Sequence, residues 1–427
     1  MPKGKVDALL GIVFGDEGKG KIVDYFAPRY DVVARYAGGP NAGHTIVFGG
    51  HKYILRSIPS GIFGADTLNI IGNGCVVAPD LFKTEALELE AAGYDVKGKL
   101  HISRRAGLIL PSHRLLDRAY ENLKGENKIG TTGKGIGPTY SDKAARIGLR
   151  VGDIEEDFKT KYNALRDRHK KILDSLCADY DLERDEQAWF EGIEYLRSCC
   201  LSDTENELQG LLNGGKSILA EGAQGTMLDL DHGTYPYVSS SSTTCGGVCT
   251  GLGVAPSQIG DVFGIFKAYS TRVGEGPFPV ELNDEIGDHL RKVGREYGAV
   301  TGRNRRCGWL DLVALKYAAR INGVTRLIMM KSDVLDGFST VKVCTAYEQK
   351  GKVIDYFPYD TSNCKPVYTE LSGWKDDISA DRTEGSLPEA LRAYIQFIEN
   401  YMQIPVAIVS VGPDREATIQ RNFVTTA

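Results

Sequence analysis

The chain has 427 residues, of which 42% are hydrophobic and 25% charged, and its formal net charge at pH 7 is -5. It is long enough to bury a large core, in two or three domains or in one elaborated α/β domain. The mild acidity argues against nucleic acid as the main partner, and no apolar run is long enough to span a membrane. The nine cysteines show no paired C-x-x-C pattern and the amino-terminal sequence has no apolar signal segment, so we expect a cytoplasmic protein with reduced thiols and no zinc site.

A strand, a glycine-rich loop and a helix are predicted at the start of the chain. The apolar run at residues 8–14 (ALLGIVF) predicts a buried strand, and residues 21–27 (KIVDYFA) have helical spacing. We call the segment between them, GDEGKGK at residues 15–21, the glycine loop. This arrangement directs backbone N–H groups and a helix N-terminus toward one point, which is how many proteins bind phosphate.

The glycine loop fits the phosphate-binding pattern G-x-x-x-x-G-K only in part. Gly15, Gly20 and Lys21 match, but Ile22 stands where a Ser or Thr would bind Mg²⁺, so a metal would need another ligand. Asp16 lies inside the loop, where a carboxylate repels phosphate unless it binds a metal or a proton. The alternative is a tight turn with charged side chains in solvent.

A second glycine-rich segment, GGPNAGHT at residues 38–45, follows a strand predicted at residues 31–36. No helical or strand periodicity explains His44, so we favour a functional histidine over a surface turn. Strands and helices then alternate, which is typical of an α/β sheet with crossover helices. The predicted elements are a hairpin at residues 46–58 that turns at Gly49 and Gly50, strands at 68–71 and 100–103, and helices at 79–92 and 113–123.

Residues 129–140 (IGTTGKGIGPTY) predict an irregular loop whose hydroxyl and amide groups are suited to phosphate or ribose. Arg146 follows in a stretch with helical spacing at residues 141–150, where an arginine more often lies in solvent or in a surface ion pair. Residues 154–212 are highly charged with helical periodicity. We expect them to form a helical subdomain added to a single domain that spans the whole chain.

Three arginines lie in residues 299–306 (AVTGRNRR), which we call the arginine loop, before a helix predicted at residues 310–319. Positive charge at a helix start opposes the helix macrodipole, so we expect these side chains to bind a carboxylate or phosphate. The alternative is a solvated basic loop. The other predicted elements are strands at residues 217–220, 262–269, 326–330, 340–347 and 406–409, and helices at 284–297 and 388–402.

Lys331, Ser332 and Asp333 directly follow the strand predicted at residues 326–330, and we call them the guanine motif. A K-x-D sequence after a strand is similar to the guanine-binding motif of GTPases, in which the carboxylate accepts hydrogen bonds from N1–H and the 2-amino group. Met330 replaces the asparagine that usually precedes this motif, so the tripeptide alone is a weak signal. The turn at residues 410–413, after the last predicted strand, could border the same base.

Together, these segments resemble the adenylosuccinate synthetase family from about Gly11 to Arg415. The matching phrases are GDEGKGK, GGPNAGHT, IGTTGKGIGPTY, EGAQGTMLDLDHGTYPYV, KAYSTRVGEGPFP, TGRNRRCGWLD, KSDVLDG and SVGPDR. The resemblance implies a ligase of AMP biosynthesis that joins IMP and L-aspartate through a 6-phosphoryl-IMP intermediate, with GTP and one Mg²⁺ per subunit. It also implies a homodimer built on a large, mostly parallel sheet flanked by helices.

The resemblance also assigns roles to residues of this chain. Asp16, His44 and Gln224 would be catalytic, and Asp16 and the Gly43 carbonyl would bind Mg²⁺. The residues that would bind GTP are Gly15, Asp16, Glu17, Gly18, Lys19, Gly20, Lys21, Arg305, Lys331, Ser332, Asp333, Ser410, Val411 and Gly412. Those that would bind IMP are Asp16, Lys19, Asn41, Ala42, Gly43, His44, Thr132, Gln224, Ser239 and Arg303, with Arg146 reaching the IMP phosphate across the dimer interface. Those that would bind aspartate are Ala299, Val300, Thr301, Gly302, Arg303, Asn304 and Arg305.

The chemistry of these residues agrees with that reaction. The O6 of hypoxanthine is a poor leaving group until a phosphoryl group from GTP is attached to it, and N1 must lose its proton for O6 to attack. Asp16 is the expected general base, a role worth about 10²–10⁴ in rate. His44 is expected to stabilise charge on O6 or the γ-phosphoryl group and to act as a general acid. Mg²⁺, Lys19 and Lys21 are expected to neutralise Asp16.

Two positions depart from the family pattern. Ser239 stands where close relatives often have threonine, and the hydroxyl is kept. Val300 replaces the first of two threonines in the arginine loop, so one hydroxyl that would bind aspartate is lost.

Two other function classes are alternatives to the ligase. A GTPase switch explains the glycine loop and the guanine motif but not residues 38–45 or the arginine loop, and it would normally have Ser or Thr at position 22. A non-catalytic nucleotide-binding scaffold would need neither Asp16 nor His44. GTP turnover with and without IMP and aspartate distinguishes the first of these from the ligase.

Overall fold

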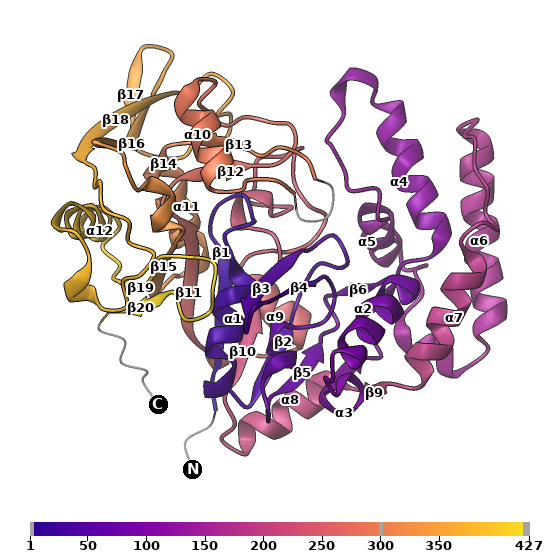
Figure 1. Cartoon of the computed structure of the whole chain (residues 1–427). Coiled ribbons are helices and arrows are strands. Elements are labelled where there is room, and N and C mark those ends of the chain that lie inside the picture. Colours follow the sequence, from indigo (N-terminus) through magenta and orange to yellow (C-terminus); the bar gives the residue numbers. More distant parts are fainter. Residues whose placement is uncertain (1–3, 299–301, 422–427) are drawn as a thin grey trace.

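A ten-stranded sheet forms the centre of the computed structural model, which describes residues 4–298 and 302–421 (Figure 1). Its strand order is β20–β19–β15–β11–β1–β10–β2–β5–β7–β9. Neighbouring strands are parallel, except that β20 runs antiparallel to β19 at one edge. The expected α/β fold with a large, mostly parallel sheet is thereby confirmed. The strands are β1 (Val6–Gly11), β2 (Val32–Arg35), β5 (Leu68–Ile71), β7 (Leu100–Ser103), β9 (Cys200–Ser202), β10 (Ile218–Glu221), β11 (Ile259–Lys267), β15 (Arg326–Met330), β19 (Val406–Ser410) and β20 (Thr418–Gln420).

From Ala8 onward the central strand β1 is buried on both faces, as the apolar run that starts there predicts. Ala8 and Leu10 pack on one side with residues of α8, α9, α11 and α12, whereas Leu9 packs on the other side with α1. The helices are α1 (Lys19–Phe26), α8 (Thr204–Asn213), α9 (Gly246–Leu252), α11 (Leu312–Asn322) and α12 (Glu389–Met402). Because both faces are covered, the sheet presents its strand ends and the loops that follow them to ligands.

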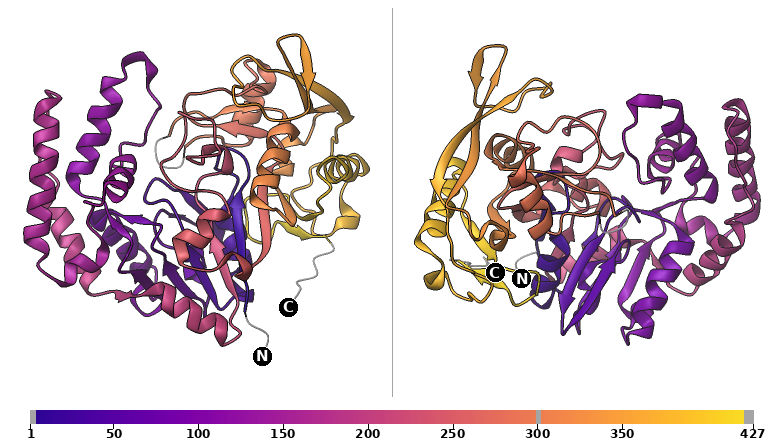
Figure 2. Two further views of the ribbon diagram at one scale, coloured as in Figure 1. Left: turned by 180° about the vertical axis from the view of Figure 1, so that it is seen from behind. Right: turned by 45° about the horizontal axis from the view of Figure 1, so that its top comes forward.

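Two groups of elements flank the central sheet on opposite sides (Figures 1 and 2). On one side, α2 packs against α7, and α4 packs against α5 and α6. On the other, β16 pairs with β14, β17 and β18 in a second sheet. These elements are α2 (Pro79–Ala91), α4 (Pro111–Leu123), α5 (Ile136–Ala145), α6 (Phe158–Ser175), α7 (Glu186–Arg197), β14 (Leu310–Asp311), β16 (Thr340–Gln349), β17 (Lys352–Ile354) and β18 (Lys365–Ser372).

Shorter elements connect these groups. They are the hairpin β3 (His44–Phe48) and β4 (His51–Leu55), the pair β6 (Val76–Val77) and β8 (Gly107–Leu108), the pair β12 (Ser270–Arg272) and β13 (Arg306–Gly308), and the helices α3 (Val96–Lys99) and α10 (Glu285–Val293). Single 3-10 turns lie at η1 (Ala27–Arg29), η2 (Ser60–Phe63), η3 (Gly125–Asn127), η4 (Val151–Glu155), η5 (Thr226–Leu228), η6 (Pro256–Gln258), η7 (Ser332–Leu335) and η8 (Glu384–Ser386). The β3–β4 hairpin turns at Gly49 and Gly50, as predicted.

Several predicted boundaries are wrong; for example, the helix expected at residues 284–297 ends at Val293. The second half of the expected loop at residues 129–140 is helical, because α5 starts at Ile136 after Gly135, whose φ of 78° lets the chain turn into the helix. Arg146 therefore does not lie within a helix but ends α5, with a φ of 63°. The segment at residues 154–212 contains helices but also β9, which pairs with β7 and so extends the central sheet.

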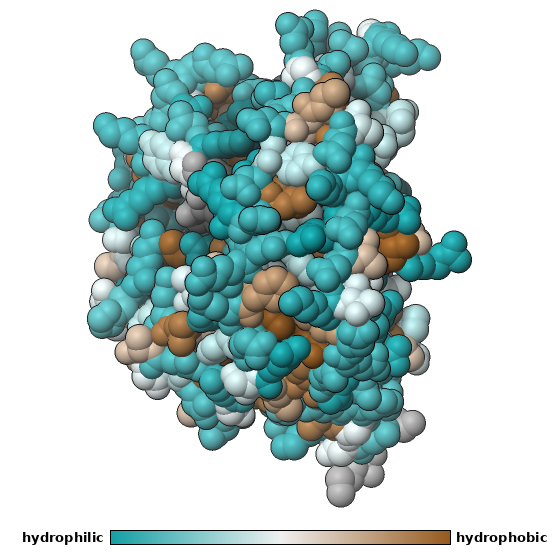
Figure 3. Space-filling model, turned by 90° about the vertical axis from the view of Figure 1, so that its right-hand side faces the viewer, coloured by the Kyte–Doolittle hydropathy of each residue, from teal (hydrophilic) through white to brown (hydrophobic). Residues whose placement is uncertain are grey.

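Within the described residues, no helix is both long and apolar enough to cross a bilayer. The face over α6 and α7 is mainly hydrophilic, and its apolar residues form small separate groups (Figure 3). This agrees with the charged sequence of that region.

Candidate active site

Parallel strands bring the predicted site residues to one edge of the central sheet. β1 leads into the glycine loop, β2 into residues 36–45, and β15 into the guanine motif, while β11 ends at Lys267 and β19 at Ser410. The carboxyl ends of neighbouring parallel strands share one edge of a sheet. Residues from distant parts of the sequence therefore meet there.

The glycine loop is braced from inside by Glu17. Gly15 (φ 85°), Asp16 (58°) and Gly18 (101°) all have left-handed backbone conformations, and for an aspartate this is a strained state of the kind found at functional sites. Glu17 is buried, and its Oε1 accepts hydrogen bonds from the N–H groups of Gly15 (2.9 Å) and Val13 (3.3 Å). The Glu17 carboxylate is therefore occupied inside the loop. A phosphate at this loop would contact Glu17 through its main chain and not through its side chain.

The two lysines of the glycine loop do not neutralise Asp16, which corrects our expectation. Lys19 pairs with Glu17, with 2.5 Å between Nζ and Oε2. Lys21 is buried, and burial lowers its pKa to about 7. Its ammonium group donates to Ser410 Oγ (2.7 Å), the Gly412 carbonyl (2.8 Å) and the Ala417 carbonyl (2.8 Å). Lys21 thereby fixes the turn after β19 beside the glycine loop. The spacing of residues along the sequence does not reveal that the Lys21 side chain points toward this turn.

The cation next to Asp16 is Arg305 of the arginine loop. Its Nε lies 2.9 Å from Asp16 Oδ2, and 34% of the Asp16 side chain is exposed. The pairing brings a residue expected to bind both GTP and aspartate against the expected general base. The Asp16 carboxylate is therefore both partly exposed and next to a guanidinium group.

His44 is buried against the first turn of α1 and is oriented by Glu221, the last residue of β10. A Cβ at Gly20 would lie only 2.7 Å from the Cβ of His44, so this close approach requires glycine. His44 Nδ1 lies 2.5 Å from Glu221 Oε1, so Nδ1 carries the proton and Nε2 is left for a ligand. Ser60 also binds Glu221, through its N–H (2.7 Å) and its hydroxyl (2.7 Å).

His44 and Glu221 shift each other's pKa. Burial lowers the pKa of His44, and Glu221 acts in the opposite direction by raising it. Burial would raise the pKa of Glu221, but the hydrogen bond from His44 and the charges of His44 and Arg35 hold it below its usual value. Glu221 was missed in the sequence, although a charged residue at the end of an apolar parallel strand is a usable signal.

Gln224 lies between the glycine loop and the serine-rich segment after β10. A Cβ at Gly15 would be 3.5 Å from the Gln224 Cα, and one at Gly38 would be 3.0 Å from the Gln224 Oε1. The Ser241 hydroxyl donates to Gln224 Oε1 (3.5 Å) and lies 3.0 Å from the Ser239 hydroxyl. Through Ser241, the structure therefore brings together Gln224 and Ser239, two residues expected to bind IMP.

Residues 38–45 form a compact turn beside Gln224. Asn41 Oδ1 accepts a hydrogen bond from the Gly39 N–H (3.2 Å), and the Ala42 N–H donates to the Gly39 carbonyl (3.1 Å). Asn41 and Gly43 are partly exposed, whereas Ala42 is buried. This turn carries His44 into β3 and leaves the Asn41 amide nitrogen for a ligand.

Residues 129–135, which we call the threonine loop, contact the arginine loop. Glu121 Oε1 accepts a hydrogen bond from the Gly130 N–H (2.5 Å), which ties the threonine loop to α4. Arg303 Nη1 donates to the Gly130 carbonyl (3.1 Å). Thr132 is exposed on this loop. Thr132 and Arg303, both expected to bind IMP, thus lie on loops that touch.

Arg146 projects from the far end of α5. It is exposed, and no ion pair joins it to another described residue. An exposed guanidinium on a left-handed helix cap is available to a second molecule.

The arginine loop is described from Gly302 onward, so the expected aspartate-binding residues Ala299, Val300 and Thr301 lie outside the described residues. Its stem is a short hairpin in which the Arg305 N–H donates to the Glu296 carbonyl (3.0 Å). Tyr297 and Asn304 form an antiparallel bridge one step further along. The loop is therefore held at its base by Glu296.

The guanine motif contains a carboxylate oxygen that lacks a donor. Asp333 Oδ1 is buried, and no described residue donates a hydrogen bond to it, and the same holds for Ser332 Oγ. Burial raises the pKa of Asp333. Buried polar atoms without partners are rare and unfavourable, so a ligand that supplies donors is expected here. Ser410, Val411 and Gly412 lie on the turn that Lys21 holds beside this motif.

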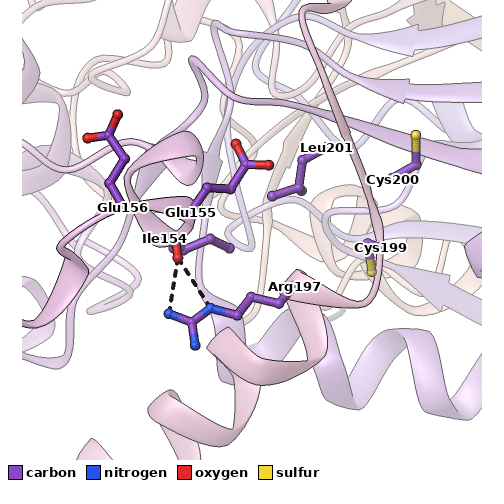
Figure 4. A pocket seen from close by; sticks show the side chains of 7 residues that line it. All are labelled: Ile154, Glu155, Glu156, Arg197, Cys199, Cys200 and Leu201. Carbon is purple, nitrogen blue, oxygen red and sulfur yellow. Dashed lines mark hydrogen bonds between the residues drawn. The ribbon is translucent and has the colours of Figure 1, made fainter.

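A surface hollow of about 700 Å³ lies away from these loops, between the η4 turn and β9 (Figure 4). Arg197 points across it and donates to the Ile154 carbonyl through Nε (3.2 Å) and Nη2 (3.0 Å). Burial raises the pKa of the Cys199 thiol to about 11 and also raises that of Cys200. Neither thiol is an activated nucleophile, so the hollow is not a catalytic site of that kind.

A second cluster of ionisable side chains lies between α4, α5 and α6. Asp142 Oδ2 is 3.0 Å from His113 Nε2 and 2.8 Å from His169 Nε2, a geometry that raises the question of a metal. His113 Nδ1, however, accepts a hydrogen bond from the Leu110 N–H (2.9 Å), so its Nε2 carries the proton and donates to Asp142. The cluster is a hydrogen-bond network that fixes α5, the helix that ends at Arg146.

Comparisons with known proteins agree with this arrangement. The sequence model of the adenylosuccinate synthetase family matches residues 8–419. The adenylosuccinate synthetases of Bacteroides fragilis and Bacteroides thetaiotaomicron are each 62% identical over 418 residues, covering 98% of this chain and 99% of each relative. The structure of fully ligated adenylosuccinate synthetase from Plasmodium falciparum is 38% identical, covers 98% of this chain and 100% of that chain, and has a TM-score of 0.92. A cyanophage S-2L succinoaminodeoxyadenylate synthetase, 20% identical with a TM-score of 0.64, shares the fold.

Proposed function

The chain belongs to the adenylosuccinate synthetase family and joins IMP to L-aspartate with hydrolysis of GTP to GDP and phosphate, and we propose that Asp16 and His44 carry the chemistry. The reaction passes through 6-phosphoryl-IMP and is the first committed step from IMP to AMP. The observation that supports this assignment most strongly is the meeting of Asp16, the His44–Glu221 pair and the guanine motif at one sheet edge. Neither a GTPase switch nor a non-catalytic scaffold requires that combination.

In the proposed mechanism, Asp16 takes the N1 proton of IMP. The electron pair shifts to O6, which attacks the γ-phosphorus of GTP, and the bond from that phosphorus to GDP breaks. For this role the His44 ring is protonated at both nitrogens, so that Nε2–H donates to the oxygen atoms of the transferred group while Glu221 accepts from Nδ1–H. The aspartate amino group then forms a bond to C6, the C6–O6 bond breaks, and phosphate leaves. Gln224, which lies between the glycine loop and Ser241, orients the purine.

We further propose that one Mg²⁺ binds in each subunit. The Asp16 carboxylate and the Gly43 carbonyl are hard oxygen donors of the type that Mg²⁺ prefers. The exposed position of Asp16 is compatible with this role, provided that Arg305 shares or releases the carboxylate. When bound, Mg²⁺ would neutralise charge on the phosphates of GTP.

Guanine recognition by Asp333 gives a direct test of the nucleotide site. Guanine offers N1–H and a 2-amino group side by side, and a carboxylate accepts both. ATP has an acceptor at N1 and no 2-amino group, so it would leave a buried carboxylate unsatisfied, at about 1–3 kcal/mol or more. Asp333→Asn replaces one acceptor with a donor, which suits xanthine, with N1–H and a carbonyl at position 2.

We expect Asp333→Asn to lower kcat/KM for GTP about tenfold or more and to raise it for XTP, with little change in the KM for IMP. Measuring kcat/KM with both nucleotides on both proteins gives the answer. Asp336→Asn, three residues along the same turn, is the matched control, because Asp336 already accepts from Trp374 (2.8 Å). An unchanged GTP:XTP ratio in Asp333→Asn would remove Asp333 from the guanine site.

We also propose a homodimer in which Arg146 of one subunit reaches the IMP phosphate of the other. Its exposure and its position on a strained helix cap support this role. Mixing an inactive Arg146→Leu chain with an inactive Asp16→Asn chain should restore some activity, because each mixed dimer contains one site with both residues intact and one site with neither. Lack of recovery despite demonstrated subunit exchange would place Arg146 outside the partner's site.

A cytoplasmic location completes the proposal. The nine cysteines are all free thiols, as expected for a reducing compartment.

A further inference from the structure

We propose that Glu296 is a positioning residue that couples the guanine site to the aspartate site. This inference rests on the proposed function, because it assumes that the guanine motif binds GTP and that the arginine loop binds aspartate. Glu296 follows α10, lies in none of the motifs that the sequence revealed, and is fully buried.

The carboxylate of Glu296 joins side chains from three separate segments. Its Oε1 accepts hydrogen bonds from Lys331 (2.7 Å) and Lys267 (2.9 Å), and its Oε2 accepts one from Arg305 (2.6 Å). The Tyr269 hydroxyl also donates to Oε1. Lys331 belongs to the guanine motif and Arg305 to the arginine loop, so one carboxylate holds the cations of both predicted subsites.

The main chain of the same residue closes the arginine loop. The Glu296 carbonyl accepts the Arg305 N–H (3.0 Å), and the Glu296 N–H donates to the Arg291 carbonyl (2.9 Å) at the end of α10. Arg305 in turn pairs with Asp16, the expected general base. A continuous set of contacts therefore runs from Lys331 through Glu296 and Arg305 to Asp16.

Charge explains why this position needs a carboxylate. Lys267, Lys331 and Arg305 carry three positive charges, and the negative charges among them belong to Glu296 and Asp16. Burial would raise the pKa of Glu296, but the three cations hold it well below its usual value, so the carboxylate is ionised. Burial lowers the pKa of Lys267 to about 8. Removing the Glu296 charge would leave the three cations to repel one another.

Loss of the Glu296 charge would affect Lys331 and Lys267 differently, because the two lysines differ in burial. Lys331 is 30% exposed and can turn toward solvent, whereas Lys267 is 2% exposed and cannot. Without the Glu296 carboxylate, the Lys331 ammonium group would keep its hydrogen bond to the Gly294 carbonyl (2.7 Å) but lose its ion pair, so the Lys331 stem would be held less firmly beside the guanine base. Arg305 would keep Asp16 as its sole carboxylate partner among the described residues and would hold it more tightly. Both effects weaken ligand binding, one at the guanine site and the other at the aspartate site.

The test compares Glu296→Gln with wild type in the adenylosuccinate-forming assay. We expect the KM for GTP and the KM for aspartate each to rise about tenfold or more, while the KM for IMP stays within about twofold. Glu296→Asp keeps the charge but is one methylene shorter and cannot reach all four donors, so it should show the same pattern to a smaller degree. If Glu296→Gln does not fold, Glu296→Asp alone tests the proposal.

Asp7→Asn is the matched control for a purely structural role. Asp7 lies at the amino end of β1, on the opposite edge of the sheet, and accepts hydrogen bonds from the Tyr30 hydroxyl (2.7 Å) and the Asp261 N–H (2.7 Å). It should lower the melting temperature without changing any KM. If Glu296→Gln and Glu296→Asp also lower only the melting temperature, or raise all three KM values alike, the coupling role is wrong. If wild type forms no adenylosuccinate in the same assay, the proposed function fails instead.

Discussion

Replacing Asp16 with asparagine is expected to lower kcat by about 10²-fold or more, because the general base is removed. Asparagine keeps nearly the same size and can still occupy the loop tip, which is exposed, so the fold should be unchanged. The loss should be larger than for a base alone, since the same carboxylate is proposed to bind Mg²⁺. Arg305 would also lose its partner at Oδ2 but keep its ion pair with Glu296, which leaves Nε available to a phosphate. GTP affinity should therefore fall much less than turnover.

The measurement is kcat for adenylosuccinate formation together with circular dichroism and thermal melting. Asp66→Asn provides the control, because Asp66 is an exposed aspartate in another loop and should leave kcat unchanged. Activity of Asp16→Asn within a few-fold of wild type would remove Asp16 from the chemistry.

The second large effect is expected at the His44–Glu221 pair. His44→Asn should retain GTP binding and lose turnover by about 10²–10⁴-fold, the usual contribution of a positioned acid or base. Titration of His44→Asn with GTP measures GTP binding, and initial rates of adenylosuccinate formation measure turnover. If His44→Asn folds normally but no longer binds GTP, His44 is a binding residue and not a catalytic one.

Glu221→Gln separates orientation from charge at the same pair. The glutamine oxygen still accepts the Nδ1–H of His44, but it no longer stabilises the protonated ring. Because Glu221 raises the pKa of His44, the variant should have a lower His44 pKa. A general acid must be protonated, so activity that falls as pH rises should fall at lower pH in the variant. If kcat has the same pH profile in Glu221→Gln and in wild type, Glu221 does not raise the pKa of the general acid.

Local patterns were sufficient to predict most strands and the main loops. β5 and β7 have the predicted bounds because short, apolar runs between turn residues can hardly form anything else. The start of α5 was missed because Gly135 and Pro138 resemble loop residues. In the structure Gly135 supplies the left-handed turn that starts the helix, and Pro138 falls in the first turn, where it is tolerated.

The direction of side chains could not be predicted. Lys21 matches a phosphate-binding lysine in spacing, yet it is buried against the turn after β19. Glu296 lies in none of the motifs, and nothing in the segment that begins at Glu221 identifies its carboxylate as the partner of His44. His44 lies 177 residues from Glu221 in sequence, and the parallel order of the strands brings the two together. Pairings of this kind depend on tertiary structure, so a single sequence does not reveal them.

The most direct test of the proposed chemistry is a substrate-omission assay. Formation of adenylosuccinate is followed by absorbance with IMP, L-aspartate and GTP together, and then with each omitted in turn, while phosphate release is measured in parallel. The ligase predicts adenylosuccinate in the complete mixture alone, with phosphate release that depends on IMP. Phosphate release from GTP at an equal rate without IMP and aspartate, and with no adenylosuccinate in the complete mixture, would contradict it.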